Sequence, residues 1–312
     1  MIYTLTLNPS IDYIVHIDQL KTGEVNRMTA DFKLPGGKGI NVSRILQRID
    51  TSSCPLGFLG GFTGDFIEKW LIEEGIQSQF TKVKEDTRIN VKLKAEEETE
   101  INGQGPALAE DEINRLKFIL SELVTSGDIV VLSGSTPAGL RKDFYQELIH
   151  IIKENGAEFV IDTTGDDLLA ALPEKPLLVK PNNHELAELY QTTLHSLDDI
   201  IVYGKKLLND GAQNVIISMA GDGALLITED GTYLSNVLKH PVKNSVGAGD
   251  SMIAGFIGNF SQSKDPLESF KWGVACGSAT TFSDDLATET LIKELFPEVT
   301  VKNIEEDYNE NQ

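Results

Sequence analysis

The chain has 312 residues, enough to bury the core of one large domain or two smaller ones. Its formal net charge of −21 argues against binding to nucleic acid or to an anionic membrane surface, because both are polyanions that such a field repels. No apolar run approaches the roughly 20 residues that cross a bilayer, and the N-terminus lacks the pattern of a secretory signal. We therefore expect a cytoplasmic protein.

Two stretches, residues 11–33 and 87–102, contain alternating apolar and polar residues with no helix between them. In the second stretch Ile89, Val91 and Leu93 face one way, so Arg88 and Asn90 face the other way together. These stretches are predicted to form a small accessory β-sheet. It is inserted discontinuously into an α/β core made of residues 1–10, 34–86 and 103–312.

A first glycine cluster, Pro-Gly-Gly-Lys-Gly-Ile-Asn-Val-Ser, spans residues 35–43 and leads into apolar residues at helical spacing. It is not a Walker A loop, which needs Ser or Thr directly after the lysine, whereas Gly39 follows Lys38. The chain also shows no G-x-G-x-x-G pattern after its first strand, so a nicotinamide-dependent dehydrogenase is a remote alternative.

From about residue 104 onward, helical and strand patterns alternate. Apolar stripes predict helices at 113–123, 141–154 and 196–209, and short apolar runs predict strands at 128–132, 158–162, 177–180 and 213–218. This alternation is typical of a largely parallel sheet with helices on both faces. Ligands of such sheets bind at the carboxyl ends of the strands.

A second glycine cluster, Val-Gly-Ala-Gly-Asp, spans residues 246–250 and opens another apolar helix. Gly247, Ala248 and Gly249 have almost no side chain, so a ligand can reach the unpaired backbone N–H groups of the helix start, whose dipole favours anions. Asp250 makes little sense as a ligand of an anion, because like charges repel. It makes sense as a base, and the pattern indicates phosphoryl transfer.

Together these segments resemble the ribokinase (PfkB) family of carbohydrate kinases over nearly the whole chain. The signature regions of the family match residues 36–42 and 246–250, and weaker motifs match residues 6–12, 87–92, 100–106, 133–137 and 179–186. The resemblance implies a ribokinase-like three-layer α/β sandwich. Its central sheet would be mostly parallel, and the small inserted β-sheet would form a lid.

The resemblance also implies the residues that hold the sugar phosphate. Asp12, Gly37 and Asn41 would hold sugar hydroxyls, and Lys38, Arg88 and Ser135 would bind the phosphate already on the sugar, with Asn90 beside them. Cationic donors suit such a phosphate, because arginine offers two parallel hydrogen bonds and lysine a point charge. Arg27 is a weaker candidate, for which a surface salt bridge is preferred.

On the nucleotide side, the resemblance implies ATP and Mg²⁺. Lys180 would lie near the ATP phosphates, and Glu185 would order the metal through water. The other expected nucleotide-binding residues are Asn182, Ser218, Gly223 and Ser278. Ala220 and Gly221 depart from the usual motif, and Ser283 stands where the family has an asparagine.

The expected reaction is ATP-dependent phosphorylation of fructose 1-phosphate to fructose 1,6-bisphosphate, with Asp250 as general base and the backbone of residues 247–250 as anion hole. Phosphorylation of tagatose 6-phosphate is the alternative within the family, and the segment Glu-Ile-Asn-Gly-Gln-Gly-Pro at 100–106 favours fructose 1-phosphate. A non-catalytic sugar-phosphate sensor is a remote alternative, because a sensor has no need of a base. The lid sheet is a candidate homodimer contact.

Overall fold

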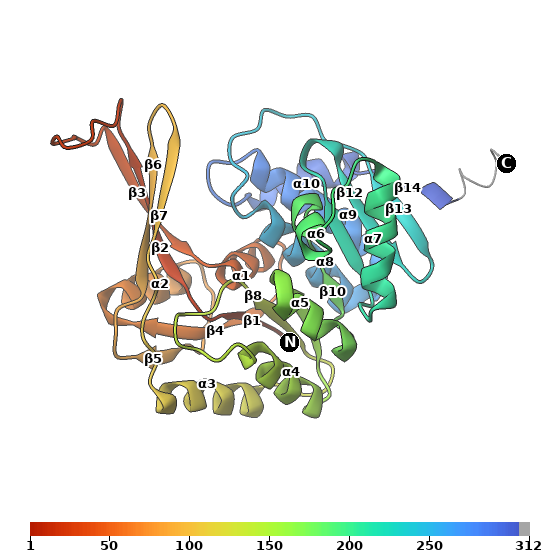
Figure 1. Ribbon diagram of the computed structural model, residues 1–312, viewed down its shortest axis with the longest axis horizontal. Coiled ribbons are helices and arrows are strands. Elements are labelled where there is room, and N and C mark those ends of the chain that lie inside the picture. Colours follow the sequence, from red (N-terminus) through yellow and green to blue (C-terminus); the bar gives the residue numbers. More distant parts are fainter. Residues whose placement is uncertain (306–312) are drawn as a thin grey trace.

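The computed structural model describes residues 1–305. Within this range the chain builds a ten-stranded central sheet between two helical layers, and a four-stranded sheet projects from it (Figure 1). In spatial order the central strands are β14 (Val301–Asn303), β13 (Gly231–Ser235), β12 (Ala224–Thr228), β11 (Val215–Ser218), β10 (Leu178–Val179), β9 (Glu158–Asp162), β8 (Ile129–Ser133), β1 (Ile2–Thr6), β4 (Ser53–Gly60) and β5 (Thr81–Val83).

The strands from β5 to β11 pair in parallel, as the alternation of helices and strands predicts. β12, β13 and β14 continue the sheet in antiparallel pairing at one edge. Residues of β1 alternate between the two faces: Tyr3 and Leu5 join one apolar core, whereas Ile2 joins the other. This period of two places a hydrophobic layer on each face, and each layer needs a cover of helices.

Helices cover both faces, giving three layers (Figure 1). One face packs against α3 (Glu110–Leu123), α4 (Phe144–Glu154), α5 (Gly165–Ala171), α6 (Asn183–Leu189) and α7 (Leu197–Asn209). The other packs against α1 (Lys38–Arg48), α8 (Ala248–Ser263), α9 (Pro266–Thr281) and α10 (Glu289–Leu295). α2 (Gly61–Glu73) packs near the small sheet, and the 3₁₀ turns are η1 (Leu172–Glu174), η2 (Ala220–Asp222) and η3 (Phe296–Glu298). None of the helices within residues 1–305 is long and apolar enough to cross a bilayer.

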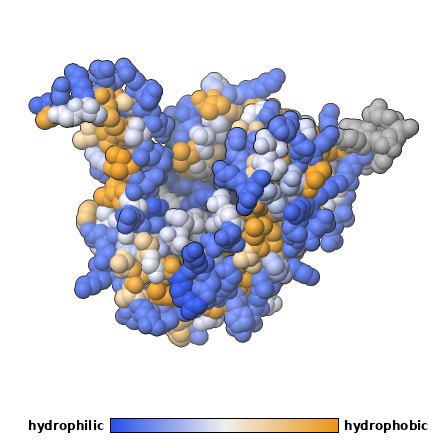
Figure 2. Space-filling view, in the orientation of Figure 1, coloured by the Kyte–Doolittle hydropathy of each residue, from blue (hydrophilic) through white to orange (hydrophobic). Residues whose placement is uncertain are grey.

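The small sheet has the strand order β3-β2-β6-β7, formed by β3 (Ala30–Gly36), β2 (Ser10–His16), β6 (Arg88–Lys94) and β7 (Glu98–Asn102). Its strands therefore fall close to the predicted stretches 11–33 and 87–102. β6 is more buried on its polar side, where Asn90 and Lys92 are buried, than on its apolar side, where Ile89 is exposed. The polar side belongs to a cleft, and Figure 2 shows the surface hollowed between this sheet and the body of the protein.

Candidate active site

A cleft of about 1130 Å³ lies at the carboxyl ends of the central strands, beside the small sheet. Residues from both glycine clusters, from the small sheet and from the strand ends line it. Every site residue expected from the sequence is among them: Asp12, Gly37, Lys38, Asn41, Arg88, Asn90, Ser135, Lys180, Asn182, Glu185, Ser218, Gly223, Gly247, Ala248, Gly249, Asp250 and Ser278. The fold thus brings these residues together, while their individual roles stay predictions.

The second glycine cluster forms the start of α8. Gly247 is its N-cap and has a φ of 79°, a conformation that favours glycine. A Cβ atom on Gly249 would lie 2.9 Å from Nζ of Lys180, so a side chain there would crowd this ammonium group. The amides of the first helical turn have no partner within the helix, so they can donate to an anion in the cleft.

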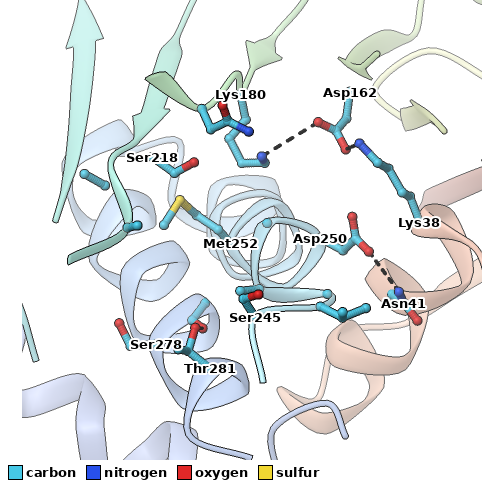
Figure 3. A pocket seen from close by; sticks show the side chains of 18 of the residues that line it. Lys38, Asn41, Asp162, Lys180, Ser218, Ser245, Asp250, Met252, Ser278 and Thr281 are labelled. Carbon is cyan, nitrogen blue, oxygen red and sulfur yellow. Dashed lines mark hydrogen bonds and ion pairs between the residues drawn. The ribbon is translucent and has the colours of Figure 1, made fainter. Parts of the chain in front are cut away.

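Asp250 is buried in the first turn of α8, with 6% of its surface exposed. Its Oδ2 accepts a hydrogen bond of 2.8 Å from Nδ2 of Asn41, which comes from the helix that follows the first glycine cluster (Figure 3). Burial raises the pKa of Asp250 to about 6, and the Asp162 carboxylate contributes to the rise, although Lys38, Asn41 and Lys180 oppose it. A carboxylate with such a pKa can accept a proton near neutral pH.

Asp162 is the main residue of the cleft that the sequence analysis missed. It ends β9, and its carboxylate lies between two lysines: Nζ of Lys38 is 2.8 Å from Oδ2, and Nζ of Lys180 is 3.8 Å from Oδ1 (Figure 3). Burial alone would raise the pKa of Asp162, but Lys180 and Lys38 hold it below its usual range. Burial also opposes the charge of Lys38, but Asp162 outweighs it and raises the pKa of that lysine. Asp162 and Lys38 are therefore both charged at neutral pH.

Arg88 lies on the side of the cleft formed by the small sheet. Its guanidinium donates to the backbone carbonyl oxygens of Asn8, at 2.9 and 3.2 Å, and of Gly103, at 3.0 Å. Burial lowers the pKa of Arg88, and no carboxylate lies within ion-pair distance of it in the described part of the chain. Carbonyl oxygens orient the guanidinium without neutralising it, so its charge remains available to an anion.

Asp12 and Asn90 lie next to each other on β2 and β6. Nδ2 of Asn90 donates to Oδ1 of Asp12 at 3.2 Å, and Nζ of Lys92 is 3.0 Å from Oδ2 of the same carboxylate. Lys92 was also missed from the sequence. Its pairing with Asp12 fixes a carboxylate that can accept hydrogen bonds from sugar hydroxyls.

Two further cleft residues, Asn8 and Ser133, lie within the motifs at residues 6–12 and 133–137 but were not singled out from the sequence. Oδ1 of Asn8 and Oγ of Ser133 are buried without a hydrogen-bond partner, and both residues line the cleft. Buried polar atoms normally have partners, so these two atoms suit a polar ligand. Arg27, by contrast, is exposed in the loop between β2 and β3 and is not among the cleft residues of the described chain.

The opposite end of the cleft is less polar. Val237, Leu238, Val246 and Phe282 line it, and Ser218, Gly223 and Ser278 lie among them. The sequence departs from the family motif at Ala220 and Gly221. Both residues lie in the 3₁₀ turn η2, which follows β11 and lines this end of the cleft. Ser283 does not line the cleft but a neighbouring depression. Such an apolar slot with a few polar groups suits a nucleobase.

Glu185 has a structural role in addition to its position in the cleft. Its Oε2 accepts a hydrogen bond of 2.8 Å from the backbone N of Asn182, and Oδ1 of Asn182 accepts one from the N of Glu185, which forms a capping box at the start of α6. Within residues 1–305, no group of three or more His, Cys, Asp or Glu side chains could hold a metal ion. Mg²⁺ needs only one or two carboxylates when it binds together with phosphates, so this donor set fits the metal of a nucleotide.

Comparisons with known proteins agree with this geometry. The model of the pfkB family carbohydrate kinases matches residues 5–291. The 1-phosphofructokinase of Bacillus subtilis (strain 168) is 50% identical over 97% of this chain and 100% of its own, and the D-tagatose-1-phosphate kinase of Bacillus licheniformis is 35% identical over 97% and 100%. The structure of phosphofructokinase-2 from Escherichia coli in complex with substrates and products superposes with a TM-score of 0.90 at 31% identity, covering 95% of this chain and 98% of that one.

These matches confirm the expected ribokinase-like α/β fold and exclude the dehydrogenase alternative. A kinase of this kind uses ATP and a sugar substrate. The chain therefore belongs to the pfkB family of carbohydrate kinases, phosphotransferases with an alcohol group as acceptor.

Proposed function

We propose that this kinase phosphorylates fructose 1-phosphate with ATP to give fructose 1,6-bisphosphate and ADP. The observation that carries the proposal is that one cleft holds both a buried carboxylate of raised pKa, Asp250, and an arginine, Arg88, that has only backbone carbonyl partners among residues 1–305. The name of the Bacillus subtilis relative supports the same substrate.

The sugar phosphate binds at the end of the cleft beside the small sheet. Arg88, Ser135 and Lys38 receive the phosphate already on the sugar, and Gly37 and Asn41 contact its hydroxyls together with Asp12 and Asn90. Binding lets Lys38 exchange part of its ion pair with Asp162 for the substrate phosphate. A sugar without that phosphate leaves the half-buried charge of Arg88 without an anion, which disfavours it.

Asp250 is the general base of the transfer. Its carboxylate accepts the proton of the sugar's primary hydroxyl as that oxygen forms a bond to the γ-phosphorus of ATP. The bond between the γ-phosphorus and the bridging oxygen breaks, and ADP leaves with the electron pair. The hydrogen bond from Asn41 orients Asp250 for this step.

The backbone amides of residues 247–250 and the ammonium group of Lys180 stabilise the negative charge on the transferring phosphoryl group. Lys180 is nearly buried, and Asp162 fixes its position. Ser218, Gly223 and Ser278 contact the nucleoside, with Asn182 at the phosphates. Mg²⁺, held by Glu185 through water and by the ATP phosphates, would supply further neutralisation of charge when bound.

The small sheet acts as a lid on the sugar side, because its polar strand faces line the cleft. Closing it over the substrates would exclude water, which otherwise competes as an acceptor. The sheet exposes large apolar residues, with Phe32 on the face that carries Asp12 and Asn90 and Ile101 on the other face, so we include in the proposal a homodimer formed through this sheet.

A panel of acceptors tests the proposed substrate. We expect fructose 1-phosphate to have the highest kcat/KM with ATP, above tagatose 6-phosphate, tagatose 1-phosphate and fructose 6-phosphate, with fructose a poor substrate. If tagatose 6-phosphate is better by about tenfold or more, a margin that one pocket contact can supply, the substrate assignment is wrong while the kinase assignment stands. Comparable efficiency on fructose would remove the role assigned to Arg88, Lys38 and Ser135.

A further inference from the structure

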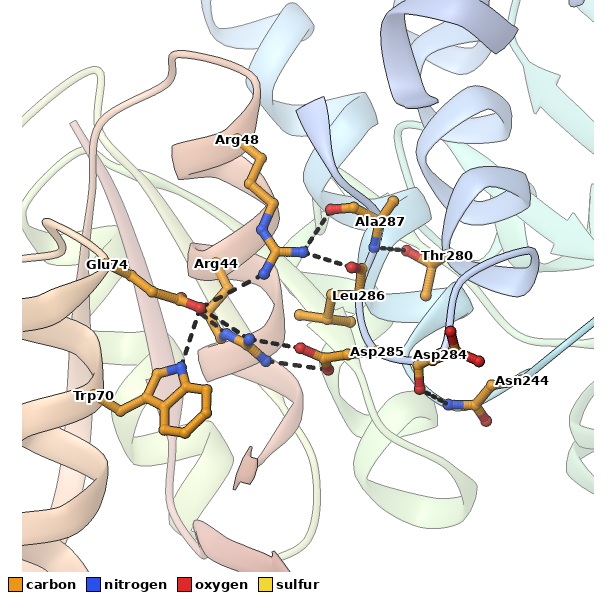
Figure 4. Close-up of polar contacts among 10 residues, drawn as sticks. All are labelled: Arg44, Arg48, Trp70, Glu74, Asn244, Thr280, Asp284, Asp285, Leu286 and Ala287. Carbon is orange, nitrogen blue, oxygen red and sulfur yellow. Dashed lines mark hydrogen bonds and ion pairs between the residues drawn. The ribbon is translucent and has the colours of Figure 1, made fainter. Parts of the chain in front are cut away.

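Arg44 is a buried arginine outside the cleft. It lies on α1, only 1% of its side chain is exposed, and two carboxylates share its guanidinium (Figure 4). Nε and Nη2 donate to Glu74 at 2.9 Å each, and Nη2 also donates to Asp285 at 2.8 Å. Burial opposes its charge, but Glu74 and Asp285 outweigh it and raise the pKa of Arg44. A buried charge is stable only while its partners stay in place, so Arg44 fixes the positions of Glu74 and Asp285 relative to each other.

The two carboxylates come from different parts of the fold. Glu74 is the C-cap of α2, where Nε1 of Trp70 also donates to it at 3.0 Å. Asp285 belongs to the segment 284–287, which links α9 to α10. Arg48, one turn after Arg44 on α1, donates to the carbonyl oxygens of Leu286 and Ala287 in that segment (Figure 4). α1 therefore holds the segment 284–287 through two arginines.

This segment supports the anion-binding loop from behind. A Cβ atom on Gly247 would lie 2.7 Å from Cδ2 of Leu286, so Leu286 packs directly against the N-cap of α8. The backbone N of Ala287 donates to Oγ1 of Thr280 at 3.1 Å, Thr280 bonds to Oγ of Ser251 at 2.7 Å, and Ser251 donates to the carbonyl oxygen of Gly247 at 2.8 Å. A continuous chain of contacts thus leads from Asp285 to Gly247.

The same helix, α1, also contacts the base. Asn41 lies one turn before Arg44 and donates to Asp250. α1 consequently holds both ends of the short stretch 247–250: Asn41 contacts Asp250 from the cleft, and Arg44 and Arg48 hold the segment behind Gly247.

The geometry points to Arg44 and Asp285 as a pair of positioning residues. They hold the anion-binding amides of residues 247–250 in a fixed position relative to Asn41 and to the base, Asp250. Neither side chain is among the residues that line the cleft. The inference rests on the proposed function, because it gives those amides a role in phosphoryl transfer. It assigns the pair to the transfer step rather than to sugar binding, since misplaced donors weaken the transition state more than the ground state.

Asp285→Asn tests the pair, with Glu74→Gln as the matched control. Each substitution removes one carboxylate charge from Arg44 and keeps the side-chain size. Asp285 belongs to the segment that packs behind Gly247, whereas Glu74 lies at the end of α2 and reaches that segment only through Arg44 and, at 3.5 Å, Arg48. We expect both variants to unfold at lower temperature. We expect kcat of Asp285→Asn to fall about tenfold with little change in KM for the sugar phosphate, since small displacements of positioning groups cost rate, whereas Glu74→Gln stays within about twofold.

Thr280→Val breaks the same connection without removing a charge, because it deletes the hydroxyl that joins Ala287 to Ser251. It should also lower kcat more than it raises KM. The inference is overturned if both Asp285→Asn and Thr280→Val keep kcat within about twofold, or if Glu74→Gln loses as much kcat as Asp285→Asn. If the wild-type protein prefers another sugar phosphate, the substrate proposal fails, and the same comparison made with that substrate still decides the role of the pair.

Discussion

Asp250 and Asp162 are two buried carboxylates in one cleft, and their surroundings make them different. Asp162 has two lysine partners and keeps its charge, whereas Asp250 has a neutral amide partner and a raised pKa. Because the two pKa values are shifted in opposite directions, one site can contain both a carboxylate that stays charged and a carboxylate that can accept a proton. In the proposed mechanism Asp162 acts without touching the proton, because its negative charge helps to raise the pKa of Asp250.

The pH dependence of turnover follows from that pKa. Asp250 works only when ionised, so kcat/KM should fall about tenfold per pH unit below about 6, the pKa of this carboxyl, and level off above it. Asp162→Asn removes a negative charge that raises the pKa of Asp250, so the acidic limb of its residual activity should move to lower pH. Measurement of kcat/KM for the sugar phosphate against pH decides this. A limb that stays in place in Asp162→Asn would contradict the coupling.

Asp250→Asn separates the base from the anion site. The amide keeps an oxygen that can accept from Asn41, so the helix start should be preserved. Loss of a general base typically costs about 10² to 10⁴ in rate, so kcat should fall by that order. ATP binding should persist or tighten, because a negative charge beside the phosphates is lost while the amides remain. Calorimetric titration with ATP and steady-state kinetics on the folded variant measure both quantities, and kcat within about threefold of wild type would contradict the mechanism.

At the scale of elements, two helices build the centre of the site. α1 presents Lys38 and Asn41 from its first turn, and α8 presents its N-terminal amides and Asp250. Both helices follow a glycine cluster because a ligand must approach the backbone there. Gly37, with a φ of 128°, and Gly247 adopt conformations in which other residues are strained.

These two elements could be predicted from the sequence because their signals are local. Small residues directly before an apolar stripe of helical spacing mark a helix start that is open to a ligand. The parallel strands β8, β9, β10 and β11 were predictable for the same reason, since each is a short buried run between helical patterns. The antiparallel edge from β12 to β14 has no comparable signal, because its pairing is set by neighbours along the sheet.

The missing parts of the site depend on contacts between distant segments. Lys38 and Asp162 are 124 residues apart, and Arg44 and Asp285 are 241 residues apart. Each is an ordinary charged residue within its own segment, so only the fold identifies its partner. Asp162 did have a usable signal: it is the last residue of a buried parallel strand, where ligand-binding side chains occur.

For the whole molecule, the net charge of −21 opposes the approach of two anionic substrates. Lys38, Arg88 and Lys180 line the cleft, but so do Asp12, Asp162, Glu185, Asp222 and Asp250. Because the Debye length is about 8 Å at physiological ionic strength, the distant surface carboxylates are largely screened from a bound substrate, which interacts mainly with the charged groups of the cleft itself.

The small sheet exposes large apolar side chains near the place where it leaves the body of the protein. Its strands project from the core, and Phe32 is 55% exposed and Ile101 62% exposed (Figure 1). A four-stranded sheet with apolar residues in the open is stabilised by packing against another surface, and a second copy of the same sheet offers one. We therefore expect a dimer in solution, with a molar mass of about twice that of the monomer by light scattering.

Phe32→Lys should weaken this dimer, because it places a charge in an apolar contact. Phe118→Lys is the matched control: Phe118 is 56% exposed, as Phe32 is 55% exposed, but it lies on α3, away from the small sheet. Only the lid variant should shift toward monomer on dilution. It should also raise KM for the sugar phosphate more than KM for ATP, since the same sheet carries Arg88 and Asn90 on its cleft side. A monomeric wild-type protein, or equal dissociation of the two variants, would show that the lid is not the dimer contact.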